Sequence, residues 1–219
     1  MARTARPCIM LPFDTLLAFF GIAIVLALTP GPDNLFVLMQ SALWGRSAGM
    51  CVVLGLCTGV LGHTAAVAIG LAAIFATSTY AFTILKLAGA AYLAYLAWQA
   101  LRARGSPVGA ERPTAMAPGA LYRRGVIMSL TNPKVLLFFF AFLPQFTSPK
   151  PEYGSVGLQT AVLGVIFMVA ALLIFSTIAF FSGAFGQLLQ RSPTATRWLN
   201  RVTGVVFLGL AIRLATASR

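Results

Sequence analysis

Two nine-residue stretches of this chain read Leu28-Thr29-Pro30-Gly31-Pro32-Asp33-Asn34-Leu35-Phe36 and Leu130-Thr131-Asn132-Pro133-Lys134-Val135-Leu136-Leu137-Phe138. Each interrupts a long apolar run, and their threonines lie 102 positions apart. Proline inside a helix removes one backbone hydrogen bond and clashes with the preceding turn. Each stretch therefore predicts a helix that breaks in its middle.

The composition around both stretches is that of a membrane protein. Of the 219 residues, 59% are apolar and 9% are charged, and the mean hydropathy is +0.88. Soluble domains average about 45–50% apolar and about 25% charged residues. This excludes a soluble enzyme, a disordered chain and a disulfide-stapled secreted module. The net charge of +12 comes from arginines between apolar runs, where they set topology and meet lipid headgroups, so we expect no nucleic-acid partner.

Six apolar segments are long enough to cross a lipid bilayer, which takes about 20 residues. We expect spans at about 15–43, 48–75, 80–101, 122–146, 156–181 and 198–215. A basic linker rich in glycine and proline, 102–121, separates a first half (1–101) from a second half (122–219). The predicted fold is an all-α integral membrane protein with six transmembrane helices in two three-helix repeats. Because three spans per repeat is an odd number, the second repeat is inverted, and the first helix of each repeat is broken.

The distribution of basic residues predicts the orientation. Connections after the first, third and fifth spans carry nine arginines, against five lysines and arginines on the other side. Cytoplasmic loops carry the excess of positive charge. We therefore expect a cytoplasmic central linker and both termini outside.

Paired interruptions in inverted halves are typical of a transporter's binding site near the bilayer midplane. Backbone groups freed by a break cost several kcal/mol each in lipid unless they line a cavity or pack in protein. A half-helix that starts at a break also directs free N–H groups and a positive dipole end into the site. The alternative is a pair of proline kinks without a binding role.

The chain resembles the LysE/RhtB superfamily of amino-acid exporters. The matching residues follow one another along nearly the whole chain: 29–34, the run from Leu85 to Leu93, and Asn132-Pro133-Lys134 with Phe139 to Phe146. The resemblance implies six spans in two inverted repeats in a bacterial inner membrane. It also implies proton-driven export of amino acids or close derivatives, without enzymatic activity or a cofactor, and leaves the individual substrate open.

Ionisable residues deep in the membrane indicate where the substrate binds, because each costs about 2.5–3.5 kcal/mol there on insertion scales. Lys134 lies in the first turn of a half-helix, where the dipole disfavours a cation, so we expect an anion nearby. That anion is either Asp33 or a substrate carboxylate. Asp33 is interpreted as a partner for a substrate ammonium, as a proton carrier, or as a helix cap. The predicted substrate-binding residues are Thr29, Pro30, Gly31, Pro32, Asp33, Asn34, Lys86, Asn132, Pro133 and Lys134.

Two further ionisable residues each have two interpretations. Lys86 either faces the cavity, which the resemblance favours, or extends to the membrane surface. His63 is either a proton carrier alongside Asp33 or a hydrogen-bonded packing residue. Glycines along the second span permit close helix packing within or between protomers, so a homo-oligomer is one of the alternatives.

Other classes of membrane protein fit less well. A thiol–disulfide electron carrier needs a reactive cysteine at each break, and Cys8, Cys51 and Cys57 all lie elsewhere. A lipid-modifying enzyme needs a nucleophile with its base or a metal triad, and one histidine with one central acid supplies neither. We therefore expect no catalytic residues and no metal site. A channel or a scaffold remains an alternative.

Overall fold

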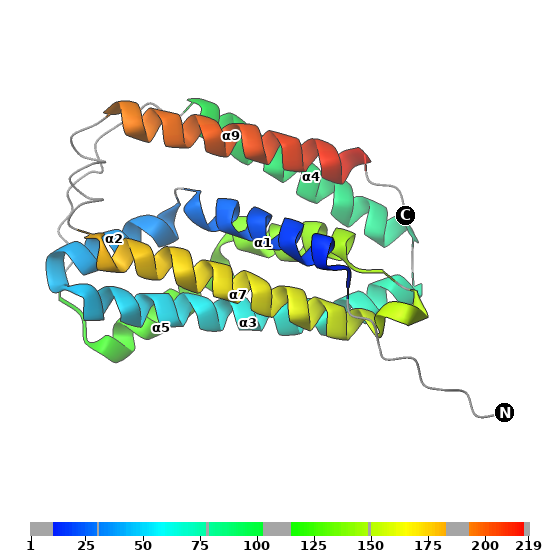
Figure 1. The fold of residues 1–219 in the computed structure, drawn as a ribbon, viewed down its shortest axis with the longest axis horizontal. Helices are drawn as coiled ribbons and strands as arrows, with labels where there is room; N and C mark the ends of the chain where they lie inside the picture. Colours follow the sequence, from blue (N-terminus) through cyan, green and yellow to red (C-terminus); the bar gives the residue numbers. More distant parts are fainter. Residues whose placement is uncertain are drawn as a thin grey trace.

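The computed structural model describes residues 11–29, 31–77, 79–102, 115–148, 150–182 and 193–216, and its regular structure in these ranges is helical (Figure 1). The described residues thus confirm the predicted all-α class. The elements are α1 (Phe13–Leu28), α2 (Pro32–Trp44), α3 (Arg46–Thr77), α4 (Thr79–Arg102), α5 (Pro118–Thr131), α6 (Pro133–Leu137), the π-helical turn η1 (Phe138–Phe142), the 3-10 turns η2 (Leu143–Phe146) and η3 (Pro151–Tyr153), α7 (Val156–Phe180) and α9 (Pro193–Thr216).

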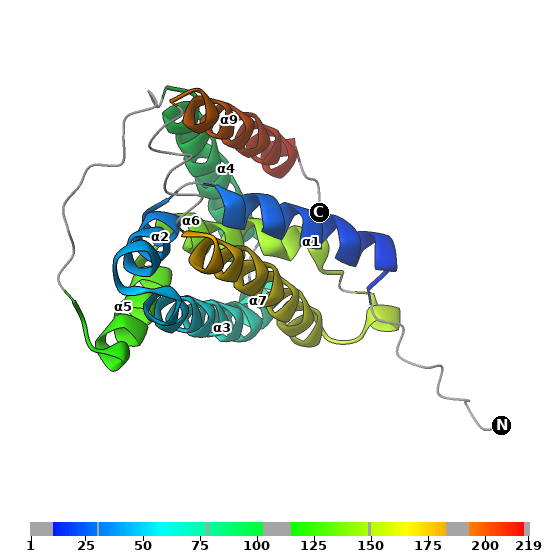
Figure 2. The same cartoon turned by 60° about the vertical axis from the view of Figure 1, so that its left-hand side comes forward.

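The helices form a main bundle and a two-helix arm. Helices α1, α2, α3, α5 and α7 belong to the bundle, whereas α4 and α9 pack against each other (Figures 1 and 2). The arm contacts the bundle mainly through η1. One end of the molecule holds the α2–α3 turn, the end of α7 and the start of α9 (Figure 1). The opposite end holds the start of α1 and the end of α9.

Several of these helices are suited to a membrane. By length and composition, α3 over Arg46–Gly70 and all of α7 could each cross one. The bent pair α1–α2, and α5 with the helical run that follows it, also qualify if each counts as one span. The described residues thus contain two to four candidate spans. Six spans in two inverted repeats stay a prediction.

Both helix breaks fall at the prolines that predict them. The helix axis bends by 62° at the first break and by 48° at the second. Pro32 and Pro133 open the second helix of each pair, where a backbone N–H would have no helical partner. Gly31 and Asn132 precede them with extended backbone, which is the conformation that a residue before proline prefers.

Close contact between α3 and α5 fixes the helix that leads into the second break. A Cβ atom on Gly55 would lie 2.1 Å from the Tyr122 carbonyl oxygen. A Cβ atom on Gly125 would lie 2.4 Å from that of Val52. Backbones this close leave no room for a side chain at either glycine. The small residues of α3 therefore serve packing within the protomer.

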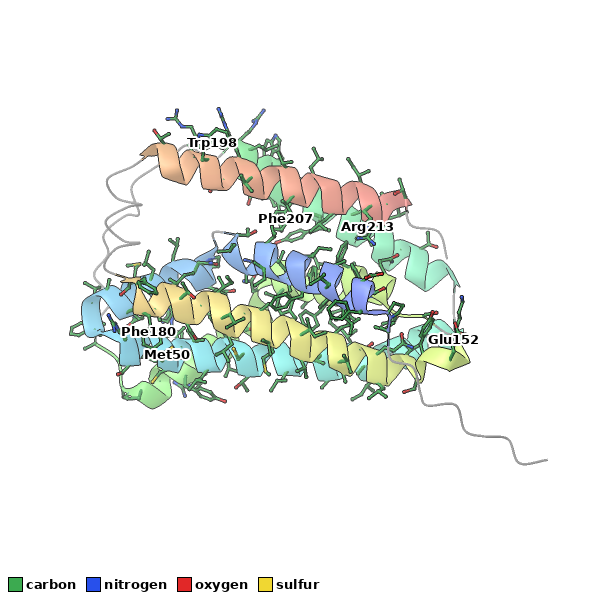
Figure 3. All side chains as sticks on the ribbon, viewed as in Figure 1. Met50, Glu152, Phe180, Trp198, Phe207 and Arg213 are labelled. Atoms are coloured by element: carbon green, nitrogen blue, oxygen red, sulfur yellow. The ribbon has the colours of Figure 1, made fainter. Side chains whose placement is uncertain are left out.

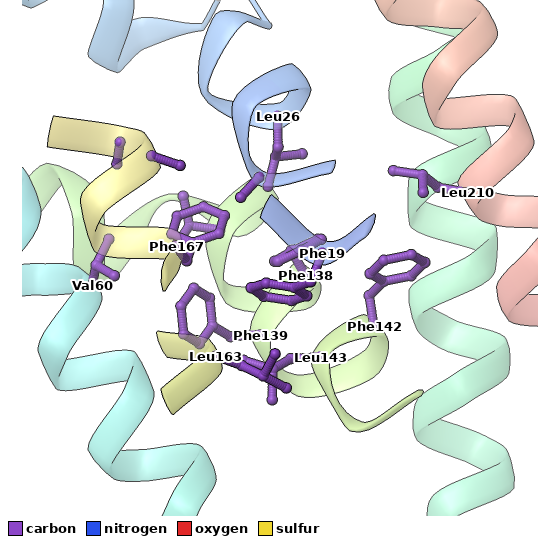
Figure 4. Close-up of a cluster of buried hydrophobic side chains, with 14 of the residues drawn as sticks. Phe19, Leu26, Val60, Phe138, Phe139, Phe142, Leu143, Leu163, Phe167 and Leu210 are labelled. Carbon is purple, nitrogen blue, oxygen red and sulfur yellow. The ribbon is translucent and has the colours of Figure 1, made fainter. Parts of the chain in front are cut away.

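An aromatic cluster fills the core beside the second break. Phe138, Phe139 and Phe142 are fully buried and pack with Phe19 of α1 and Phe167 of α7 (Figure 4). Neighbouring ring centroids in the cluster are 5.1 to 6.1 Å apart, in tilted and edge-on arrangements that aromatic rings favour. The cluster lies between the break and the end of the molecule where α1 starts.

Candidate functional site

The two breaks, far apart in sequence, meet in the core. Asp33 lies in the first turn of α2, and Asn132 caps the junction of α5 and α6. The Asn132 side-chain Nδ2 donates a hydrogen bond of 2.5 Å to Asp33 Oδ2. Both side chains are buried, with Asp33 only 2% exposed. The amide thus connects the acidic break to the basic one.

Lys134 reaches in the opposite direction, from the second break to the first. Its side chain is 7% exposed, and its Nζ lies 3.4 Å from the Leu26 carbonyl oxygen and 3.3 Å from that of Thr29. These carbonyls belong to the end of α1, where the helix dipole favours a cation. The Lys134 backbone N–H donates to Asn132 Oδ1 at 3.0 Å. The end of α1 therefore compensates for the unfavourable position of Lys134 in its own helix.

Of the two anions proposed for Lys134, Asp33 approaches it only indirectly. Within the part of the chain that the structure describes, the two side chains form no ion pair with N···O at or below 4.0 Å. Asn132 contacts both residues instead. Lys134 thus has neutral carbonyls as its partners, and its positive charge has no described anion in contact. A buried cation in this position can accept an anionic ligand.

Two buried oxygen atoms beside the bridge have unused bonding capacity. Asp33 Oδ1 and Asn34 Oδ1 have no hydrogen-bond partner among the described residues. The Asn34 amide nitrogen donates to the Ala27 carbonyl oxygen at 2.7 Å, which fixes its orientation. Buried polar atoms are usually paired, so an orphan oxygen indicates a group to be bound there, such as a proton or a water molecule.

Two cavities meet at Lys134. The smaller, of about 20 Å³, also borders Asp33, Ser129 and Phe167, and has room for one water molecule. The larger, of about 350 Å³, lies between the breaks and the α4–α9 arm. Asn132 borders the larger cavity, whereas Asp33 borders the smaller one. Lys134 therefore borders the space where a small molecule fits. The carboxylate of Asp33 lies on the other side of Asn132.

Gly31 keeps the approach to this ammonium open. It borders the larger cavity, and a Cβ atom on it would lie 3.3 Å from Lys134 Nζ. Thr29, Pro32 and Pro133 border the same cavity. The Thr29 hydroxyl is occupied by a hydrogen bond to the Val25 carbonyl oxygen, while its own carbonyl accepts from Lys134.

The remaining predicted residues lie apart from this group or outside the described residues. His63 is buried in α3, with Nε2 3.1 Å from the Ser129 carbonyl oxygen and its ring against Phe139. It approaches the smaller cavity only through Ser129. Lys86 lies on α4, but its side chain is outside the described residues, as is Pro30.

The structure also adds residues that the sequence analysis did not select. Tyr92, Gln99 and Asn200, on α4 and α9, line the larger cavity opposite the breaks. Polar amides inside apolar helices were the available signal for Gln99 and Asn200. The described residues hold no group of three or more histidine, cysteine, aspartate and glutamate side chains that could bind a metal. Cys51 and Cys57 are free thiols on α3.

Comparisons with known proteins identify the family of the chain. The family model of LysE type translocators matches residues 24–218. The homoserine/homoserine lactone efflux protein of Salmonella typhimurium is 31% identical over 209 residues, covering 94% of this chain and 98% of that protein. An uncharacterized membrane protein of Vibrio cholerae is 31% identical over 205 residues, covering 92% of this chain and 96% of that protein.

A second uncharacterized membrane protein, from Pseudomonas aeruginosa, is 32% identical over 206 residues, covering 90% of this chain and 93% of that protein. No solved structure matches the chain. The family model spans most of the sequence and includes both breaks. The chain therefore belongs to the LysE type translocator family and is a membrane transport protein of the amino-acid-export type.

Proposed function

We propose that this protein is a secondary transporter that moves amino acids or closely related small zwitterions out of the cell, coupled to protons. The observation that carries the proposal is the ammonium of Lys134, which borders a cavity of about 350 Å³ and has no carboxylate in contact among the described residues. A buried ammonium at the edge of a cavity that holds no other fixed charge attracts a carboxylate, the group that amino acids share.

The substrate carboxylate binds Lys134 from the larger cavity, over Gly31. The bound anion pairs directly with an ammonium whose hydrogen bonds go to the carbonyls of α1, and whose nearest described acid, Asp33, lies beyond ion-pair distance. Removing the ammonium therefore removes the main attraction for the carboxylate. Nothing else bordering this cavity in the described chain carries a fixed charge.

The proton is carried by Asp33. Its Oδ1 has no partner among the described residues, and Asp33 lines the smaller cavity, whereas its hydrogen-bond partner Asn132 lines the larger one. This geometry favours the proton role over direct binding of the substrate ammonium. Neutralising Asp33 weakens its attraction to Asn132 and Lys134, so substrate and proton occupancy are linked through one amide.

Export follows from alternating access around the two breaks. Six spans in two inverted repeats would rock about the site in the bacterial inner membrane, with the central linker in the cytoplasm. The larger cavity reaches from Lys134 toward the end of the bundle where α4 ends and α9 begins. Helix α4 ends there at Arg102, directly before the basic linker in the sequence, so with a cytoplasmic linker this cavity would load substrate from the cytoplasm. The aromatic cluster closes the site toward the opposite end.

The name of the Salmonella relative suggests the first substrate to test, homoserine. Purified protein is reconstituted into vesicles loaded with radiolabelled homoserine, threonine, leucine or lysine, and efflux is followed with and without a proton gradient. We expect wild-type protein to release at least one of these amino acids in a saturable, protonophore-sensitive way.

The variant Lys134→Ala tests the carboxylate site. We expect it to keep the wild-type helical content and elution profile and to release substrate no faster than empty vesicles. Lys150→Ala is the matched control, because Lys150 is solvent-exposed. Wild-type efflux from Lys134→Ala would remove Lys134 from the site, and an inactive wild-type protein on the whole panel would contradict amino-acid export.

A further inference from the structure

We infer that the α4–α9 wall of the larger cavity binds the side chain of the transported molecule, and that it selects a small, polar and uncharged one. This inference rests on the proposed export function and adds the substrate class. Tyr92, Gln99 and Asn200 form the polar part of the wall, and Leu96 and Phe207 form its apolar part. Phe207 points from α9 toward the bundle (Figure 3).

The polar part of the wall carries hydrogen-bonding groups. Tyr92 and Asn200, both half-buried, place a hydroxyl and an amide at this wall. Gln99 Nε2 donates to the Tyr95 hydroxyl at 2.5 Å, which leaves the Gln99 carbonyl oxygen free to accept. Together they offer donors and acceptors, which suits a hydroxyl or carbonyl group on a substrate side chain.

The size of the cavity limits the side chain. Its volume of about 350 Å³ is near the lower end of ligand pockets, which span about 300–1,000 Å³. Lys134, Asn132 and Gly31 form the opposite wall, where the carboxylate is proposed to bind. A short side chain extends from there to the arm, with its methylene groups against Leu96 and Phe207.

The charge of the cavity excludes ionised side chains. Lys134 is the single lysine, arginine, aspartate or glutamate among the described residues that line it. A lysine-like side chain would place a second cation in this space without an anion to pair with. A glutamate-like side chain would add a second carboxylate for one ammonium. Each leaves one charge in the cavity without a partner of opposite sign, which is unfavourable.

Two of these residues lie close to the end of the bundle and are accessible to substitution. Gln99 is exposed and lies in the last turn of α4, which ends at Arg102. Asn200 lies two turns into α9, which begins at Pro193. A carboxylate introduced at either position borders the cavity and leaves the Asn132–Asp33 and Lys134–α1 hydrogen bonds in place, because neither residue takes part in them.

The test introduces a carboxylate into the wall and measures which substrate is then released faster. Wild-type protein, Asn200→Asp and Gln99→Glu are reconstituted separately into vesicles loaded with homoserine, threonine, lysine or glutamate. We expect the wild type to release homoserine or threonine faster than lysine and glutamate by at least about tenfold, the discrimination expected from one unpaired charge. In each acidic variant, we expect the lysine-to-homoserine ratio to rise by about tenfold.

Thr194→Asp is the matched control, because Thr194 is an exposed residue of α9 that does not line the cavity. It should keep the wild-type ratio. Gln99→Glu changes an exposed side chain and so keeps the test valid if Asn200→Asp fails to fold. Wild-type export of lysine or glutamate at the homoserine rate, or unchanged ratios in the folded acidic variants, would overturn the inference and leave amino-acid export standing. A wild type that exports nothing on the panel would overturn both.

Discussion

The two helix breaks look alike in sequence but contribute different chemistry. The first presents the carbonyls that end α1 and the carboxylate of Asp33. The second presents the amide of Asn132 and the ammonium of Lys134. Each break supplies the partner that the other lacks, because the lysine binds the α1 carbonyls and the amide binds the carboxylate.

This difference indicates what the two similar stretches share. Proline occurs in both and gives both the same local geometry, a helix that restarts after an extended residue. The ionisable residue differs, so an acid and a base occur once each. An asymmetric pair can bind a substrate on one side and a proton on the other. The predictions below remove one contribution at a time.

Removing either ionisable group is expected to have a larger effect than any other change. Asp33→Asn keeps the hydrogen-bonding shape but cannot change protonation state. We expect export against a substrate gradient to fall to the level of empty vesicles, while exchange of labelled for unlabelled homoserine continues. Lys134→Ala should lose both activities, since it removes the carboxylate site.

Gradient-driven export and exchange are measured in the same vesicle preparation. The outcome separates the roles of the two breaks: equal loss of export and exchange in Asp33→Asn would assign Asp33 to substrate binding. Undiminished uphill export would remove Asp33 from proton coupling altogether.

The amide bridge is the next contribution to remove. Asn132→Leu takes away the donor to Asp33 and the acceptor of the Lys134 N–H, leaving buried polar groups without partners. Each such group costs about 1–3 kcal/mol, and more when it is charged. We expect a lower melting temperature and export reduced by roughly tenfold to a hundredfold.

The neighbouring variant Thr131→Val provides the control for Asn132→Leu. The Thr131 hydroxyl is exposed and bonds within its own helix, to the Ile127 carbonyl oxygen. Melting is followed by tryptophan fluorescence and export by homoserine efflux. If both variants behave alike, the bridge contributes nothing specific to the site.

The sequence predicts the local structure of the breaks better than their contacts. The interruptions at Thr29–Pro32 and Asn132–Pro133 follow from proline, which acts through its own backbone and the preceding turn. The membrane class follows from composition alone. The family, first indicated by motifs at both breaks, is confirmed by the family model.

The contacts across the breaks depend on tertiary packing and could not be derived from the sequence. The sequence left either Asp33 or a substrate carboxylate as the anion near Lys134, and the structure places Asn132 in contact with both Asp33 and Lys134. The side of the cavity formed by Tyr92, Gln99 and Asn200 depends on how the α4–α9 arm meets the bundle. No local sequence pattern predicts how this arm packs against the bundle.

A methyl group at Gly31 tests access to the ammonium with a smaller expected effect. Its Cβ would lie 3.3 Å from Lys134 Nζ, which is tight, but the end of a flexible side chain can shift. The Gly31 backbone is extended, so alanine adopts it without strain. We expect Gly31→Ala to raise the KM for homoserine by roughly threefold to tenfold, with little change in melting temperature.

Gly21→Ala is the control for Gly31→Ala, because a Cβ atom on Gly21 would meet no atom within 4 Å. It should leave KM unchanged. A KM increase of the same size in both variants would show that the effect does not arise at Lys134.

His63 takes no part in the hydrogen bonds that join the two breaks, so its substitution should have the smallest effect. Its Nε2 contacts the Ser129 carbonyl oxygen, and its ring packs on Phe139. Glutamine keeps one hydrogen-bonding group there, so His63→Gln should cost about 1 kcal/mol or less of folding free energy. We expect export within about twofold of the wild type, with full protonophore sensitivity. Loss of protonophore sensitivity in this variant, with exchange intact, would instead make His63 part of the proton path, reaching Asp33 through Ser129 and the smaller cavity.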